Sequence, residues 1–289
     1  MGNICSKKTK DASEKAYLPI LTELGLNFSL DDWRNFHKEG SIEQYQAELE
    51  NLGVDLKKSQ SFPKCLTRAV FICCNTYTKP EYSLGVGPLN DAITVANYMK
   101  KIGFNIYFIH NSRSIEYMKY FKNFLQKTTE YLFIYYIGHS ACDDAKNEDG
   151  LKIKDEALIF DDNYLFDDKL VDDLINSKKS ESCKVYLLSD CCHSSHIYNL
   201  QASVNSGKKF PPNIMVFSTV RQSETVKETS VGGTDYGIFT FYFFKILSQN
   251  DSITPNKMES QIDQYLKRFQ QNFVVYSTTE SLLNEPIFK

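Results

Sequence analysis

No apolar run in this sequence is long enough to cross a membrane, and neither sign of charge is in large excess. The longest apolar runs, such as Tyr131–Ile137, are far shorter than the roughly 18 to 20 residues of a membrane-spanning helix. Lys and Arg number 33 against 36 Asp and Glu, which gives a net charge of -3. The short apolar runs predict that no helix spans a membrane. The balance of charge does not indicate a dominant phosphate-binding surface, so we expect no nucleic-acid partner.

The sequence also lacks the signals of secretion, of nucleotide binding and of phosphatase chemistry. No apolar signal region follows Met1, and the eight cysteines include two adjacent pairs, which rarely form a disulfide with each other. There is no Gly-Lys-Ser or Gly-Lys-Thr loop, and no cysteine is followed six positions later by an Arg. We therefore predict a cytoplasmic protein with reduced, mostly buried thiols and no organic cofactor.

The distribution of polar and apolar residues predicts three parts. Residues 1–16 form a basic tail. Residues 17–62 are mostly polar, with apolar side chains at helical spacing such as Tyr45 and Leu49, which predicts a short helical region. Residues 63–289 have the length of one large domain.

The N-terminal residues fit the pattern for N-myristoylation. In Met1-Gly2-Asn3-Ile4-Cys5-Ser6 the acceptor is Gly2, the required hydroxyl is on Ser6, and Cys5 is placed for palmitoylation. A single myristoyl chain binds membranes only marginally, and Cys5 or the three lysines that follow would supply the second signal. We predict attachment to the cytosolic face of a membrane; the alternative is a basic tail without lipid.

Beyond Cys65, short β-branched and aromatic runs alternate with amphipathic segments. The expected strands are Arg68–Cys74, Phe104–His110, Tyr131–Ile137, Lys184–Ser189 and Asn213–Thr219, and the expected helices are Asn90–Lys101, Ser114–Lys127 and Asp168–Asn176. This alternation predicts an α/β fold with a mainly parallel central sheet flanked by helices. Active sites in such sheets lie at the carboxyl ends of the strands.

Two of the expected strands end on reactive residues. The third is followed by Gly138-His139-Ser140 and the fourth by Asp190-Cys191-Cys192-His193. If residues 142–179 form a crossover, the two strands are neighbours and their ends share one edge of the sheet. A thiolate beside an imidazole is the nucleophile and base of a cysteine peptidase, so His139 and Cys192 are the candidate catalytic pair.

These motifs resemble those of metacaspases, which are caspase-fold cysteine peptidases of the C14 family. His139 and Cys192 are about 50 residues apart, the separation typical of caspases. Five segments resemble family motifs in family order: Pro88-Leu89-Asn90-Asp91-Ala92, Ile137-Gly138-His139, Asp190-Cys191-Cys192-His193-Ser194, Arg221-Gln222-Ser223-Glu224-Thr225 and Gly237-Ile238-Phe239-Thr240. The resemblance implies a caspase-like three-layer fold and a monomer, with Cys192 as the nucleophile.

The resemblance also implies cleavage of peptides and proteins after Arg or Lys. Asp91 and Asp190 occupy the positions at which the family lines the pocket for the P1 residue, and carboxylates suit a guanidinium or an ammonium group. A second interpretation of Asp91 is that it caps the helix that follows Pro88. The two roles are not exclusive.

Acidic residues are frequent between His139 and Cys192, and hard oxygen ligands at this density suit calcium. The resemblance implies a calcium-activated site in which Asp155, Asp167 and Asp168 are ligands, although Asn199 stands where some members carry a further Asp. The alternative is a solvated acidic loop without metal.

Three departures from the family motifs leave a second function open. Ser140 and Ser195 replace glycines, and Ile137 replaces a serine. If either glycine position requires a positive φ, serine is strained there. The alternative hypothesis is therefore a weak or inactive metacaspase-like regulator or scaffold at the membrane.

Overall fold

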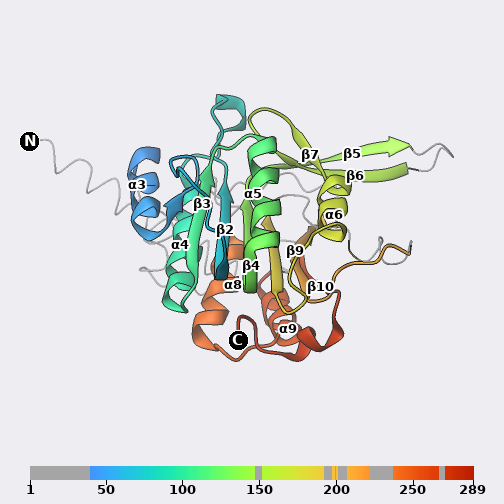
Figure 1. Ribbon diagram of the computed structural model, residues 1–289. Coiled ribbons are helices and arrows are strands. Elements are labelled where there is room, and N and C mark those ends of the chain that lie inside the picture. The colour runs from blue at the N-terminus through green and yellow to red at the C-terminus, as the bar shows by residue number, and fades with distance from the viewer. Residues whose placement is uncertain are drawn as a thin grey trace, which may run out of the picture. The chain divides into compact units, whose positions relative to one another are not determined.

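Seven of the described strands form one sheet, in which only the last strand is antiparallel to its neighbour (Figure 1). The computed structural model describes residues 40–146, 152–191, 197–198, 200, 207–221, 237–266 and 271–289. In the order of the sheet, the strands are β1 (Val54–Asp55), β3 (Asn105–His110), β2 (Leu66–Cys74), β4 (Thr128–Ile137), β8 (Lys184–Asp190), β9 (Ile214–Arg221) and β10 (Gln271–Ser277). All elements named below belong to one structural unit, Ser41–Lys289.

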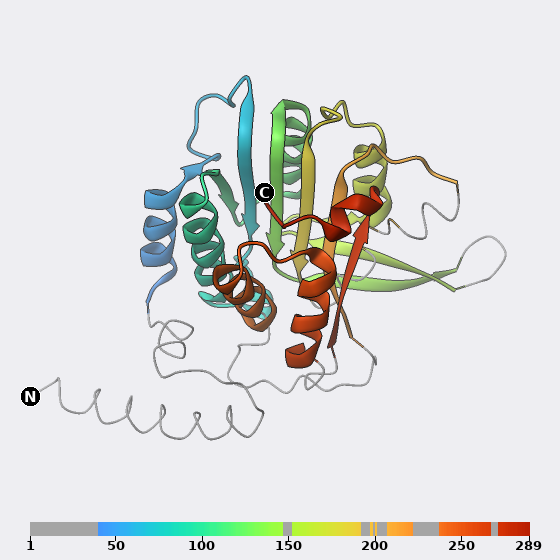
Figure 2. The same ribbon diagram turned by 90° about the horizontal axis from the view of Figure 1, so that it is seen from below.

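Helices cover both faces of this sheet. Figure 2 shows α4 (Gly87–Lys101), α8 (Gly237–Gln249) and α9 (Pro255–Leu266) on one side, and α5 (Ser114–Lys127) and α6 (Asp167–Ile175) on the other. Further helical segments in the described part of the chain are α3 (Ile42–Leu52), beside α4, and the short η1 (Pro80–Tyr82) and η3 (Glu280–Asn284). The predicted α/β fold with a mainly parallel, helix-flanked sheet is therefore confirmed.

Burial on both faces explains why the central strands are continuous apolar runs rather than alternating ones. The last six residues of β4 are all buried. On the α5 side, the ring of Phe71 stacks on those of Tyr117 and Phe124, with centroid separations of 5.6 and 4.9 Å. Such pairs contribute about 0.5 to 1.5 kcal/mol each beyond the area that they bury.

The acidic stretch between His139 and Cys192 contains regular structure in its described residues. There β5 (Ser140–Lys146), β6 (Lys152–Ile159) and β7 (Tyr164–Phe166) form a small antiparallel sheet, which α6 follows. Each strand is joined to the next by a backbone ladder, so this acidic segment pairs with itself before the chain returns to β8. The predicted crossover between β4 and β8 is present, and these two strands pair in parallel.

In the part of the chain that the structure describes, no helix has the length and apolarity needed to span a membrane. The predicted tail, residues 1–16, and residues 17–39 of the predicted helical region lie outside the described residues, as do the lipidation positions Gly2 and Cys5.

Helix α3 begins with a capping box, in which the side chains of Ser41 and Gln44 each accept a backbone N–H of the other.

Candidate active site

The ends of the three central strands are in register. Cys74 of β2 pairs with Ile137 of β4, and Ile137 pairs with Asp190 of β8. His139 therefore lies two residues beyond the same edge at which β8 ends. Gly138 N donates a 3.5 Å hydrogen bond to the Asp190 carbonyl oxygen, which connects the two strand ends directly.

The predicted nucleophile Cys192 lies just outside the described residues, as do Ser195 and Asn199. Its neighbour Cys191 is described, and only 4% of its surface is exposed. Cys191 belongs to the hydrophobic core on the α5 side of the sheet. The described cysteines form no disulfide: Cys73, Cys74, Cys183 and Cys191 are buried, and Cys65 is exposed.

The imidazole of His139 has a defined tautomer. Its Nε2 lies 2.9 Å from the backbone oxygen of Tyr82, at the end of η1. A carbonyl oxygen can only accept a hydrogen bond, so Nε2 carries the proton. In the neutral ring, Nδ1 then keeps its lone pair, which is the state that a general base needs.

Position 138 requires glycine because there is no room for a side chain, and not because of the backbone angles. A Cβ at this position would lie 2.7 Å from the hydroxyl oxygen of Tyr77 and 2.9 Å from that of Tyr136. Ser140 begins β5 and is not among the described residues with positive φ. Ser140 therefore does not carry the strain that a serine would have at a positive φ.

Asp91 and Asp190 are both buried, with 4% and 5% of their surfaces exposed. Thr240, in the first turn of α8, donates its hydroxyl and its backbone N–H to Oδ2 of Asp190, at 2.6 and 3.3 Å. The Thr240 hydroxyl is also 2.8 Å from the hydroxyl of Tyr135. Oδ2 of Asp91, in contrast, has no hydrogen-bond partner among the residues that the structure describes.

Burial raises the pKa of both carboxyl groups. The pKa of Asp190 rises to about 7, because burial outweighs the two hydrogen bonds from Thr240, which lower it. The pKa of Asp91 is raised well above its ordinary value, first because of burial and then because of the nearby charge of Asp190. The charge of Asp190 reaches Asp91, so the two carboxyl groups that the sequence predicted as a pair are neighbours.

The alternative role of Asp91 as a helix cap is wrong. Helix α4 begins at Gly87, its N-cap residue is Val86, and Asp91 lies inside the helix on its buried face. Pro88 explains the early start, because the fixed φ of proline suits the first turn of a helix. Burial of Asp91 is therefore unrelated to capping.

Of the three predicted calcium ligands, the structure describes the side chains of Asp167 and Asp168 but not that of Asp155. Asp167 is buried and its Oδ1 accepts the Asp168 backbone N–H at 2.9 Å, whereas Asp168 is exposed and lies 4.0 Å from Lys208 Nζ. Asp155 lies on β6, paired with Asp143 of β5. No group of three or more His, Cys, Asp or Glu side chains suited to a metal ion occurs within the described ranges. Calcium binding stays a prediction.

Sequence reasoning did not identify Tyr77, Tyr82, Tyr135 or Thr240 as site residues. Thr240 was part of a recognised motif, Gly237-Ile238-Phe239-Thr240, but only as a marker of the helix. The three tyrosines carry no local signal, because 18 tyrosines are spread along the chain.

Comparisons with known proteins agree with this fold. The chain is similar to protein GSU0716 from Geobacter sulfurreducens, with a TM-score of 0.52 and 13% identity over 77% of this chain and 98% of that one. It is also similar to Caspase-1 from Spodoptera frugiperda, with a TM-score of 0.50 and 12% identity over 77% of this chain and 91% of that one. At these identities the likeness concerns the fold alone. No curated protein matches the chain.

The family model of the caspase domain matches residues 66–285. This range includes the strand ends that bear His139 and Asp190, the buried aspartate of α4 and the segment with Cys192. Since the match spans most of the sequence, the chain belongs to the caspase-domain family of cysteine peptidases, C14.

Proposed function

We propose that the protein is a metacaspase-like cysteine endopeptidase that cleaves after Arg or Lys. The observation that carries this proposal is the buried pair Asp91 and Asp190, beside the strand end that precedes His139. Two neighbouring carboxyl groups without a cation among their described partners are unfavourable in a protein interior. An Arg or Lys side chain would supply the missing charge, whereas a P1 Asp would be repelled.

The chemistry assigned to the pair His139 and Cys192 is acyl transfer. Nδ1 of His139 takes the proton of the Cys192 thiol, and the thiolate attacks the carbonyl carbon that follows the P1 side chain. The imidazolium then gives this proton to the departing amine, which leaves an acyl-enzyme thioester. A water molecule, deprotonated by the same imidazole, hydrolyses the thioester and restores the thiol.

The position of the carboxyl pair supports the proposed P1 preference. Ile137 and Asp190 are register partners, so their side chains point to the same face of the sheet. Asp91 reaches this face from α4. A guanidinium placed there is held by charge-assisted hydrogen bonds, and its stem lies against the apolar side chain of Ile137.

Hydrolysis of fluorogenic peptides with Arg, Lys or Asp at P1 tests the proposal. We expect the wild type to cleave the Arg and Lys peptides and Cys192→Ala to be inactive. Asp91→Asn should raise KM for the Arg peptide at least about tenfold, because it removes one charge-assisted contact. Asp251→Asn, at an exposed aspartate, is the matched control and should leave KM unchanged. Cleavage after Asp would contradict the pocket assignment. Absence of any cleavage by folded protein, with calcium or with a chelator, would favour the inactive regulator.

We also propose that N-terminal acylation attaches the peptidase to the cytosolic face of a membrane. The sequence Met1–Ser6 and the basic residues that follow support this proposal. Expressed in cells, the wild type should sediment with membranes, Gly2→Ala should be soluble, and Cys5→Ser should bind only weakly. Equal soluble fractions of all three would contradict lipid attachment.

A further inference from the structure

Tyr77 has an unusual backbone conformation next to the candidate base. Its φ is +63°, in the left-handed region that residues with a side chain rarely adopt, and only 5% of its surface is exposed. Such a conformation costs roughly 1 to 3 kcal/mol and persists only where the surroundings hold it.

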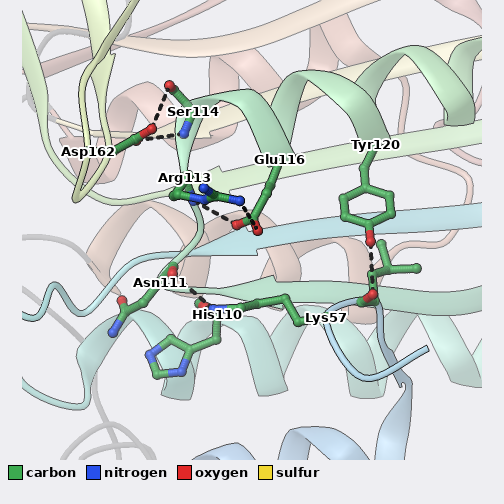
Figure 3. Close-up of polar contacts among 9 residues, drawn as sticks. Lys57, His110, Asn111, Arg113, Ser114, Glu116, Tyr120 and Asp162 are labelled. Carbon is green, nitrogen blue, oxygen red and sulfur yellow. Dashed lines mark hydrogen bonds and ion pairs between the residues drawn. The ribbon is translucent and has the colours of Figure 1, made fainter. Parts of the chain in front are cut away.

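The side chain of Asn111, just after β3, holds this turn. Its Oδ1 accepts the backbone N–H groups of Thr76 and Tyr77, at 2.7 and 2.9 Å. Asn111 is itself left-handed, with φ +47°, and its own N–H donates to the carbonyl of Cys74. Lys57 also contacts the end of β3: its Nζ donates to the carbonyl oxygens of His110 and Asn111, at 3.1 and 3.2 Å (Figure 3).

From this turn, the side chain of Tyr77 reaches the main chain of His139. The His139 N–H donates to the Tyr77 hydroxyl oxygen at 2.6 Å, and that hydroxyl donates to the carbonyl oxygen of Ile159 at 3.0 Å. The hydroxyl of Tyr136 lies 2.8 Å from the carbonyl oxygens of both His139 and Ile159, and the His139 carbonyl also accepts the Ile159 N–H at 3.1 Å. Both polar groups of the His139 main chain are therefore contacted by tyrosine hydroxyls.

The aromatic ring of Tyr77 contacts the imidazole itself. The two ring centroids are 4.9 Å apart and the planes are inclined by 29°, which is a stacked arrangement. With Nε2 bonded to Tyr82, this stack defines both the plane of the imidazole and its rotation in that plane. A tyrosine face also attracts a cation within about 6 Å, so it favours the imidazolium that forms when the thiol ionises.

We propose that Tyr77 is the positioning residue of His139: its hydroxyl fixes the histidine main chain, its ring fixes the imidazole, and Asn111 maintains the left-handed turn that brings both there. The inference rests on the proposed function, because it assigns to His139 the role of base. It adds a residue that the catalytic motifs do not contain.

The first test compares Tyr77→Phe, which removes only the hydroxyl, with Tyr77→Leu, which removes the stack as well. Tyr120→Phe is the matched control, because the Tyr120 hydroxyl donates to a carbonyl oxygen, that of Leu56, at 2.8 Å, away from the site (Figure 3). For a peptide with Arg at P1, we expect kcat to fall between about tenfold and about a hundredfold in Tyr77→Phe, and further in Tyr77→Leu. KM should be unchanged in both variants, and Tyr120→Phe should match the wild type.

The second measurement is the rate of alkylation of Cys192 by iodoacetamide between pH 5 and pH 10, with Cys192→Ala as the blank. It follows the thiolate and needs no P1 side chain. The midpoint of the wild-type profile should move to higher pH in Tyr77→Leu, where the imidazolium loses its aromatic neighbour, and stay in place in Tyr120→Phe. Tyr136→Phe removes the tyrosine contact to the His139 carbonyl and leaves the bond from the Ile159 N–H, so it should lower kcat in the same direction. It replaces Tyr77→Phe if that variant does not fold.

The outcomes separate this inference from the proposed function. A wild type that cleaves Arg peptides, together with folded Tyr77 variants that keep its kcat and its alkylation profile, would overturn the positioning role alone. A wild type that cleaves no peptide, but whose alkylation midpoint rises in Tyr77→Leu, would overturn the peptidase proposal and leave the role of Tyr77 standing.

Discussion

A buried aspartate needs hydrogen-bond donors or a proton, and the two aspartates of the candidate pocket meet this need differently. Asp190 receives two donors from Thr240, which partly offset its burial. Oδ2 of Asp91 has no hydrogen-bond partner among the described residues, and burial, followed by the charge of Asp190, raises its pKa well above the ordinary value. Asp190 titrates near pH 7. An arriving guanidinium displaces protons from this pair.

Affinity for an Arg substrate should consequently depend on pH near neutrality. The raised pKa means that Asp190 is protonated below pH 7 and charged above it, so KM should fall as pH rises from 6 to 8. Thr240→Val removes the hydroxyl bond that lowers this pKa and should move the transition to higher pH. The measurement is KM across this range for peptides that differ only in Arg or Gln at P1. A KM for Arg that is as flat as that for Gln would contradict the assignment.

At the scale of elements, β3 is connected to α3 and to the loop after β2 by one buried histidine. His110 is the last residue of β3, with its Nδ1 3.2 Å from Gln46 Oε1 of α3 and its Nε2 2.8 Å from the Thr76 hydroxyl. An amide oxygen only accepts, so Nδ1 donates to Gln46 and Nε2 accepts from Thr76 in the neutral ring. Burial and then the charge of Lys57 lower the His110 pKa to about 4.

This histidine should make the fold sensitive to acid. Unfolded, its pKa is about 6.5, so below that pH the unfolded chain binds a proton that the folded chain does not. The stability that His110 contributes is complete above pH 6.5 and is lost as pH falls towards 4, by up to about 3 kcal/mol. Urea unfolding at pH 7 and pH 5 should show a smaller loss in His110→Gln, which keeps a donor and an acceptor. An equal loss of unfolding free energy in the wild type and in His110→Gln would show that other groups cause the acid sensitivity.

At the scale of the whole molecule, the last described residues cover the sheet on its α8 side. The ring of Phe288 packs against those of Phe104, Phe133 and Tyr186, with centroids 5.8, 5.3 and 4.9 Å away. The Phe288 carbonyl oxygen accepts a 2.9 Å hydrogen bond from Arg68 of β2. These contacts join β2, β4 and β8 to a segment that is distant in sequence, and they lie away from His139.

Loss of the Phe288 ring should destabilise the fold without altering the chemistry. Phe288→Ala leaves a cavity among aromatic rings and should lower the free energy of unfolding by about 3 to 5 kcal/mol. Phe166→Ala is the matched control, because its side chain is 47% exposed, and it should change stability by less than about 0.5 kcal/mol. Urea unfolding measures both, and kcat of Phe288→Ala below its unfolding transition should equal that of the wild type. A marked loss of kcat in the folded variant would contradict this separation.

The elements that sequence patterns predicted well are those that are buried on both faces. The expected strands and helices match β2, β3, β4, β8, β9, α4, α5 and α6 closely, because covered strands need continuous β-branched and aromatic runs and their helices need one apolar face. The patterns missed β1, which is two residues long, the acidic hairpin of β5 and β6, and the edge strand β10. Backbone pairing forms β1 and the hairpin with little apolar signal. Strand β10 does contain an apolar run, Phe273–Tyr276, which the pattern analysis did not interpret as a strand.

Some residues of the candidate site were likewise predictable from local sequence, and others were not. His139, Asp91 and Asp190 were identifiable in the sequence because each belongs to a short motif at the end of a strand or the start of a helix. The roles of Tyr77, Tyr82, Thr240 and Asn111 depend on contacts between residues far apart in the chain: the Tyr82 carbonyl selects the histidine tautomer, and Thr240 lowers the pKa of one buried aspartate. Local sequence specifies which groups can react, but their protonation and orientation depend on burial and on hydrogen-bond partners, and folding alone brings those partners together.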